Sequence, residues 1–222
     1  MLDGYARSDM SSALSDGGGA LKRRDPLDQR LARTLVRPLV HTAVTPNHLT
    51  TLRLLLGLGA CASYAMGGAL WFVVGSIMFL LSTLLDHADG ELARLSGKTS
   101  RLGHLYDLVA DVLVQVLLFI AIGIGLRHTW LGETALALGL VAGVVIGGLF
   151  YVCQTLENRM GEKQAGLPRV AGFDAEDALY VVAPITWIGG LEVLLILAVI
   201  GAPLFLAWLL WQHRRVIFAR EW

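Results

Sequence analysis

Residues 86–111 read DHADGELARLSGKTSRLGHLYDLVAD, and this stretch decides the fold of the chain. It straddles two apolar segments, so that Asp86 and Asp89 end one predicted helix while Asp107 and Asp111 begin the next. Residues three or four positions apart share one face of an α-helix. The short turn between the segments contains glycine and serine and folds the two helices into a hairpin. We therefore predict that the four carboxylates face one another at the edge of a membrane.

These carboxylates predict a metal site. At close range they repel one another, and burial raises the free-energy cost of each charge. One or two divalent cations would compensate, and oxygen ligands favour Mg²⁺ or Mn²⁺. The alternative is that the aspartates are helix caps or loop charges, which is disfavoured because Asp107 and Asp111 lie within an apolar helix. The predicted metal ligands are Asp86, Asp89, Asp107 and Asp111.

The composition independently indicates a membrane protein. The chain is 55% hydrophobic with a mean hydropathy of +0.61, and 16% of its residues are charged; about 25% is usual for soluble domains. The net charge of zero gives no reason to expect a nucleic-acid partner. We predict an all-α, polytopic membrane protein with six transmembrane helices, at about 48–66, 69–93, 103–126, 134–156, 174–189 and 190–211.

Four segments are expected along the 222 residues. Residues 1–25 are predicted to be a disordered cytosolic tail, because they lack the apolar run of a secretory signal. Residues 26–44 carry leucines every four positions with arginines between them, which predicts an amphipathic juxtamembrane helix in the interface. A helix packed on the bundle is the alternative. Residues 45–213 would form the transmembrane catalytic domain, and residues 214–222 a second cytosolic tail.

The placement of basic residues predicts the orientation. Of 18 Lys and Arg, only Arg127 falls on the side opposite the N-terminus. By the positive-inside rule, both termini and the aspartates face the cytosol. The expected location is therefore the cytoplasmic membrane, with the site on its inner side.

The aspartate frame resembles the signature of a known family. The pattern Asp86-x2-Asp89-Gly90-x2-Ala93-Arg94-x8-Gly103-x3-Asp107-x3-Asp111 fills every fixed position of the CDP-alcohol phosphotransferase (phosphatidyltransferase) signature, class I. The resemblance extends from about Pro26 to the C-terminus. It implies a membrane enzyme of phospholipid synthesis that moves a phosphatidyl or similar group from a CDP-linked donor to an alcohol and releases CMP. It also implies a homodimer.

The resemblance further implies roles for individual residues. Asp111 would be the general base that deprotonates the acceptor alcohol, although the sequence does not separate that role from metal ligation. Two metal ions about 3.5 to 4 Å apart would stabilise the attacked phosphorus and the departing CMP. The residues expected to bind CDP are Asp89, Gly90, Ala93, Arg94 and Gly103 of the signature, with Asn47 and Thr50 at the entry into the first span.

Other roles for three of these residues remain open. Gly90 and Ala93 could leave room for the nucleotide, or they could permit close helix packing. Arg94 could pair with a phosphate or with the aspartates, or it could extend toward the interface without a partner.

The acceptor is the least determined part. Basic residues after the fourth span could bind a phosphorylated acceptor, but the positive-inside rule predicts such charges in any case. They are Arg159, Lys163 and Arg169. The DGELAR version of the motif is most similar to family members that transfer to inositol phosphates. Glycerol phosphate, serine, inositol, choline and ethanolamine also remain open as acceptors, and the donor could be CDP-diacylglycerol or a smaller CDP-alcohol.

Three other functional classes fit the sequence less well. An aspartate-rich membrane prenyltransferase would need a second aspartate motif, and this chain has one such frame. A transporter or channel would not require the glycines, alanine and arginine at these intervals. A non-enzymatic scaffold would explain the hydrophobicity but not the motif.

Overall fold

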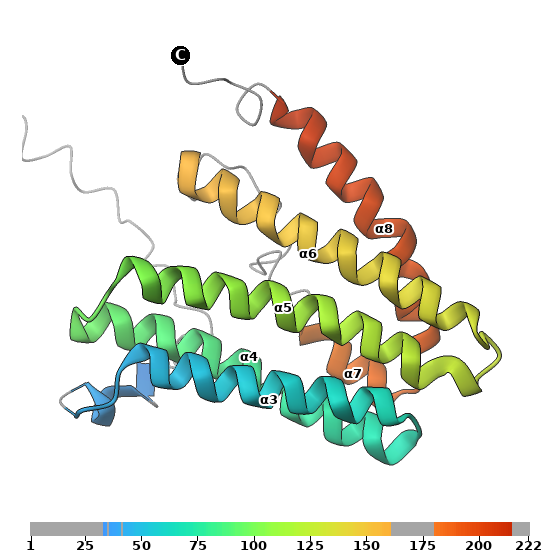
Figure 1. Ribbon diagram of the computed structural model, residues 1–222, viewed down its shortest axis with the longest axis horizontal. Coiled ribbons are helices and arrows are strands. Elements are labelled where there is room, and N and C mark those ends of the chain that lie inside the picture. Colours follow the sequence, from blue (N-terminus) through green and yellow to red (C-terminus); the bar gives the residue numbers. More distant parts are fainter. Residues whose placement is uncertain (1–32, 35, 41, 161–179, 215–222) are drawn as a thin grey trace, which may run out of the picture.

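The computed structural model of the chain describes residues 33–34, 36–40, 42–160 and 180–214, with residues 157–160 described by their backbone alone. These residues form helices and no strand (Figure 1). The all-α prediction is therefore confirmed. The helices are η1 (Arg37–Leu39), α3 (Pro46–Met66), α4 (Ala69–Ser96), α5 (Arg101–Gly125), η2 (Leu126–His128), α6 (Thr134–Met160), α7 (Val182–Trp187) and α8 (Leu191–Gln212).

Five of the described helices are long and apolar enough to cross a membrane, namely α3, α4, α5, α6 and α8. Each has at least 21 residues, which corresponds to the roughly 30 Å of a bilayer core at about 1.5 Å per residue. They coincide with five of the six predicted spans. The predicted span 174–189 is described only from residue 180, where α7 has six residues. The count of six stays a prediction.

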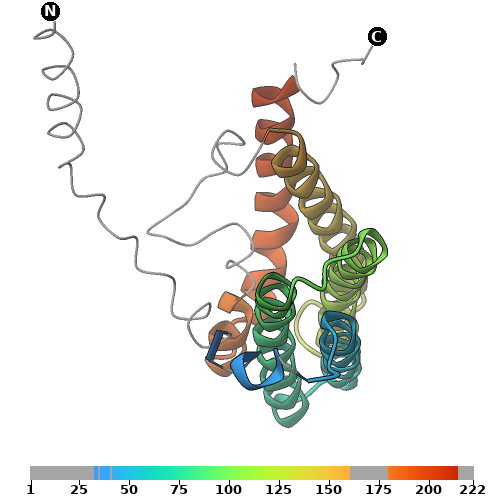
Figure 2. The same ribbon diagram turned by 90° about the vertical axis from the view of Figure 1, so that its left-hand side faces the viewer.

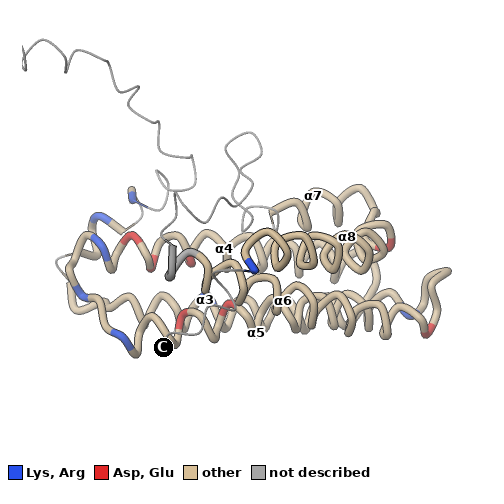
Figure 3. Tube along the Cα trace, turned by 90° about the horizontal axis from the view of Figure 1, so that it is seen from above, with Lys and Arg blue, Asp and Glu red and all other residues tan. Residues whose placement is uncertain are grey.

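The helices form a bundle in which α3 packs on both α4 and α5, α5 on α6, and α6 on α8. Figure 2 views this bundle from the end where α4 turns into α5, with α6 and α8 extending to one side of the other helices. Figure 3 shows that charged residues gather toward the same end. At this end the three helices α3, α4 and α5 lie together.

The turn between α4 and α5 has clear local causes. Gly97 ends α4 with φ +66°, a left-handed conformation that glycine adopts without steric cost. Ser100 then begins α5, because its Oγ accepts a hydrogen bond from the backbone N–H of Gly103 at 2.9 Å. The turn reverses the chain within four residues, 97–100, and places the end of α4 beside the start of α5.

The segment before α3 is described in part. Val36 is fully buried and packs with Leu49, Ala88 and Leu92 of α3 and α4, so this part of the chain contacts the bundle. Residues 26–32 lie outside the described residues, and the interfacial helix over 26–44 therefore stays a prediction. The predicted tails 1–25 and 214–222 also lie outside them, apart from Arg214.

Candidate functional site

The aspartates converge as the hairpin requires. Asp86 and Asp89 project from α4, and Asp107 and Asp111 from α5. One carboxylate oxygen each from Asp86, Asp89 and Asp107 lies within 4.8 Å of the others. All the donors are carboxylate oxygens, the ligand type that hard divalent cations prefer. The geometry therefore fits a divalent cation.

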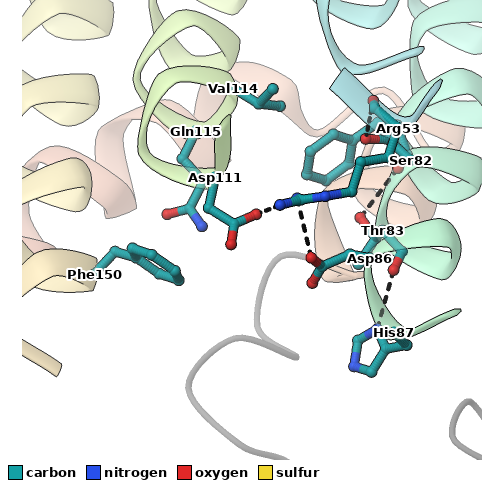
Figure 4. A pocket seen from close by; sticks show the side chains of 10 residues that line it. Arg53, Ser82, Thr83, Asp86, His87, Asp111, Val114, Gln115 and Phe150 are labelled. Atoms are coloured by element: carbon teal, nitrogen blue, oxygen red, sulfur yellow. Dashed lines mark hydrogen bonds and ion pairs between the residues drawn. The ribbon is translucent and has the colours of Figure 1, made fainter. Parts of the chain in front are cut away.

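A buried arginine from α3 stands among the aspartates. The guanidinium of Arg53 lies 3.0 Å from Asp86 and 3.2 Å from Asp89, and it donates hydrogen bonds to the side chains of Asp107 and Asp111. Nη2 also donates to the backbone carbonyl of Asp107 at 3.1 Å. Figure 4 shows the side chain reaching between Asp86 and Asp111. One side chain thus contacts all four carboxylates.

Arg53 is held tightly in this position. The residue is 3% exposed, and its backbone carbonyl accepts a hydrogen bond from Ser82 Oγ at 2.8 Å. Its Nε forms no hydrogen bond, although it lies 3.2 Å from an oxygen of Asp89. One positive charge against four negative charges leaves the cluster with a net negative charge. This net negative charge favours the binding of additional cations, because unpaired buried charges are costly.

Asp89 has a second buried partner. Thr50 Oγ1 donates a hydrogen bond to Asp89 Oδ2 at 2.8 Å, and Thr50 is 3% exposed. Thr50 lies three residues before Arg53, so both side chains project from the same face of α3. The N-terminal part of α3 therefore orients the carboxylates of α4 and α5.

A pocket of about 280 Å³, which we call pocket A, opens on one side of the aspartates. All seven residues expected to bind CDP line it: Asn47, Thr50, Asp89, Gly90, Ala93, Arg94 and Gly103. Its other lining residues are Pro46, Lys98, Thr99, Ser100, His104 and Asp107. The structure thus brings these seven residues together, and it adds Lys98 as a cation beside them.

The two signature glycines serve different purposes. A Cβ at Gly90 would meet only the Arg94 guanidinium among the described atoms, at 3.8 and 3.9 Å, so Gly90 faces pocket A rather than a neighbouring helix. A Cβ at Gly103 would lie 2.9 Å from both Asn47 Oδ1 and Ser100 Oγ. Gly103 therefore allows α5 to approach the start of α3.

Arg94 pairs with a residue that the sequence analysis left out. Its Nε and Nη2 lie 3.0 and 2.9 Å from Glu91 Oε2. Glu91 is 4% exposed, and its other oxygen accepts a hydrogen bond from Arg33 Nε at 2.6 Å. Glu91 thus holds Arg94 at the rim of pocket A.

A smaller cavity of about 40 Å³, which we call pocket B, adjoins the cluster (Figure 4). Asp86, Asp111 and Arg53 line it together with Gln115, one turn along α5 from Asp111. The remaining lining residues are Phe79, Ser82, Thr83, His87, Val114 and Phe150. Asp111 therefore faces a different space from Asp89 and Asp107.

The residues expected to bind the acceptor are not placed. Arg159 lies in the last turn of α6, where the backbone alone is described, and Lys163 and Arg169 lie outside the described residues. Their role stays a prediction.

Arg53 is the main residue that sequence reasoning missed. An ionisable residue within a transmembrane segment marks a functional site by default, and Arg53 stands among the apolar residues of α3. That signal was present in the sequence. The sequence pattern alone does not show which carboxylates the Arg53 side chain contacts.

Comparison with known proteins identifies what the chain is similar to. The family model described as CDP-alcohol phosphatidyltransferase matches residues 43–219, which include every helix of the site. Two solved structures of phosphatidylinositol phosphate synthase from Mycobacterium tuberculosis share the fold. One, with CDP-DAG bound, aligns with a TM-score of 0.58 and 20% identity over 82% of this chain and 94% of that one. The other, in complex with manganese and citrate, gives 0.54 and 21%, over 82% and 89%.

Curated relatives match over shorter stretches. The bifunctional IPC transferase and DIPP synthase of Aquifex aeolicus is 32% identical over 46% of this chain and 23% of its own length. The protein of the same description from Thermococcus kodakarensis is 36% identical over 43% and 20%. The archaetidylinositol phosphate synthase of Pyrococcus horikoshii is 29% identical over 49% and 54%. The matched part thus spans less than two thirds of each relative.

Proposed function

The chain belongs to the CDP-alcohol phosphatidyltransferase family, and from this membership we propose that it is an integral membrane enzyme that transfers a phosphatidyl or similar group from a CDP-linked donor to an alcohol and releases CMP. Membership argues against the prenyltransferase, transporter and scaffold alternatives. One observation carries the proposal: the aspartates of α4 and α5 converge beside pocket A, which all seven residues expected to bind CDP line.

We propose Asp86, Asp89 and Asp107 as the ligands of the divalent cation, Mg²⁺ or Mn²⁺, and we expect two ions. Support comes from their convergence within 4.8 Å and from the manganese complex of a protein with the same fold. When bound, such cations neutralise the pyrophosphate of the donor and polarise the bond that breaks. Pocket A would hold the CDP part of the donor, with Arg94 and Lys98 beside its phosphates.

Asp111 is proposed as the general base. The oxygen of the acceptor hydroxyl forms a bond to the donor phosphorus, and its proton passes to the Asp111 carboxylate. The bond between that phosphorus and the oxygen of CMP breaks, and CMP leaves with the electron pair. Asp111 lines pocket B, which shares no lining residue with pocket A. The acceptor hydroxyl is therefore expected to approach from the side of pocket B.

An inositol phosphate is the acceptor that we propose, with glycerol phosphate as the second candidate. Two of the proteins to which the chain is similar are named as synthases of archaetidylinositol phosphate and phosphatidylinositol phosphate. One of the solved structures contains CDP-DAG, which supports CDP-diacylglycerol as the donor. The basic residues Arg159, Lys163 and Arg169 are proposed to bind the acceptor phosphate.

We further propose that the protein lies in the cytoplasmic membrane with both termini and the site in the cytosol, and that it is a homodimer. Residues 45–213 would form the catalytic domain. Support for the orientation is the gathering of basic residues at the end of the bundle that carries the site (Figure 3).

The test is CMP release by the purified protein in lipid nanodiscs. CDP-diacylglycerol would be supplied with inositol phosphate, glycerol phosphate, free inositol or serine, with Mg²⁺ or Mn²⁺ and after chelation. We expect release that requires the cation and is fastest with inositol phosphate. The Asp89→Asn variant is the control for contaminating activity. Absence of CMP release with every acceptor, or undiminished release after exhaustive chelation, would contradict the proposal.

A further inference from the structure

We infer that Arg53 is a positioning residue, a fixed cation that holds the four aspartates together before any metal ion binds. The inference starts from its contacts. Arg53 touches one oxygen of each carboxylate, Oδ1 of Asp86, Asp107 and Asp111 and Oδ2 of Asp89.

The position of Arg53 indicates that its role differs from that of the metal ion. Arg53 lines pocket B and does not line pocket A. It comes from α3, whereas the carboxylates come from α4 and α5. It therefore links three helices and is not among the residues that line pocket A, where the donor is proposed to bind.

The charge of Arg53 is permanent. A guanidinium does not lose its proton in proteins, and the 3% exposure of Arg53 keeps water and salt from screening its interactions. Without this charge, the carboxylates of α4 and α5 would repel one another across the hairpin. The metal-free protein should then lose stability, because a buried charge without its partner is strongly destabilising.

Lysine should not replace this arginine fully. Nη1 contacts Asp86 and Asp111, Nη2 contacts Asp107, and Nε lies near Asp89. These contacts use the planar shape of the guanidinium, which a single ammonium group cannot reproduce. Arg53→Lys keeps the charge but loses the simultaneous contacts.

The first measurement is thermal unfolding in EDTA, which needs no metal and no substrate. Arg53→Gln should unfold roughly 10 °C below wild type. Arg101→Gln is the matched control, since Arg101 is exposed at the start of α5 and should leave the unfolding temperature unchanged. Equal unfolding temperatures for Arg53→Gln and wild type would overturn the inference.

A combined variant distinguishes charge compensation from packing. Adding Asp107→Asn and Asp111→Asn to Arg53→Gln removes two of the four negative charges. If Arg53 acts through charge, the combined variant should recover most of the lost stability. If Arg53→Gln does not fold, recovery of folded protein in the combined variant supports the inference. A combined variant that is as unstable as Arg53→Gln, or that also fails to fold, overturns it.

The last measurement is Mn²⁺ binding by titration calorimetry, and this step alone rests on the proposed function. Arg53→Lys should bind Mn²⁺ about tenfold more weakly than wild type, because groups that orient metal ligands typically contribute about 10- to 100-fold in affinity. Unchanged affinity would overturn the positioning role. If wild type itself binds no Mn²⁺, the proposed metal site fails, while the unfolding measurements still decide the role of Arg53.

Discussion

The hydrogen bond from Thr50 to Asp89 allows a quantitative prediction. Thr50→Val keeps the shape of the side chain but removes the hydroxyl that donates to Asp89 Oδ2 at 2.8 Å. Hydrogen bonds to charged groups are worth about 1.5–3 kcal/mol. At about 1.4 kcal/mol per factor of ten, this corresponds to a loss of about 10- to 150-fold in an equilibrium constant. We expect Mn²⁺ affinity to fall by an amount in this range.

The neighbouring threonine supplies the control. Thr51 donates a hydrogen bond to the backbone carbonyl of Asn47 at 2.8 Å and lies 3.1 Å from the hydroxyl of Tyr106, and it is not among the residues that line pocket A or pocket B. Thr51→Val makes the same chemical change on the same helix and should leave Mn²⁺ affinity unchanged, and Thr50→Ser should retain most of it. Titration calorimetry in nanodiscs measures all three variants. Equal losses in Thr50→Val and Thr51→Val, or no loss in either, would refute the reasoning.

Four further predictions concern turnover, the donor, the topology and the acceptor. Asp111→Asn should lower turnover by about 10²- to 10⁴-fold and preserve donor binding; near wild-type CMP release would show that it is not the base. Glu91→Gln should raise the KM for the CDP donor, by only about two- to fivefold because the Arg94 side chain is 65% exposed; an unchanged KM would deny Glu91 a role in holding Arg94. Cysteine introduced at Ser96 should be labelled in intact cells only by a membrane-permeant maleimide, and labelling by an impermeant reagent would reverse the topology. Arg159→Ala should raise the KM for an inositol phosphate and leave that for the donor unchanged; a selective effect on the donor would refute the assignment.

The fold followed from the sequence where local causes were sufficient. Long apolar runs determine helices in a membrane, because the backbone must satisfy its own hydrogen bonds there. Gly97 and Ser100 mark the turn between α4 and α5 through the conformations and hydrogen bonds that they favour. The stretch from 174 to 189 contains Pro184 and ends at Gly189, next to Gly190, and these residues disfavour a continuous helix; its described part includes the short α7. Proline and glycine act on the backbone locally, and their positions do not determine how many residues of an interrupted segment are helical.

The carboxylates of the site could be predicted from the sequence more readily than the basic side chains that contact acidic residues there. Helix periodicity and the family signature were enough to predict that the aspartates converge and that seven of the residues lining pocket A belong to the site. Arg53 reaches the aspartates, and Arg33 reaches Glu91, from segments distant in the sequence, with separations of 33 residues from Arg53 to Asp86 and 58 from Arg33 to Glu91. A pattern confined to one hairpin contains no information about such partners. The contacts of Arg53 depend on the packing of α3 against α4 and α5, and the contact of Arg33 depends on the packing of the segment before α3 against α4.

The two pockets give the aspartates different places in the proposed reaction. Phosphoryl transfer requires the attacking and leaving oxygens to be roughly in line with the phosphorus between them. Asp89 and Asp107 line pocket A, where the departing CMP would lie, and Asp111 lines pocket B, from which the hydroxyl would approach. In the proposed reaction the cluster would therefore lie between the leaving group and the attacking hydroxyl. Because Arg53 contacts carboxylates of both groups, its proposed positioning role would include fixing the spacing between them.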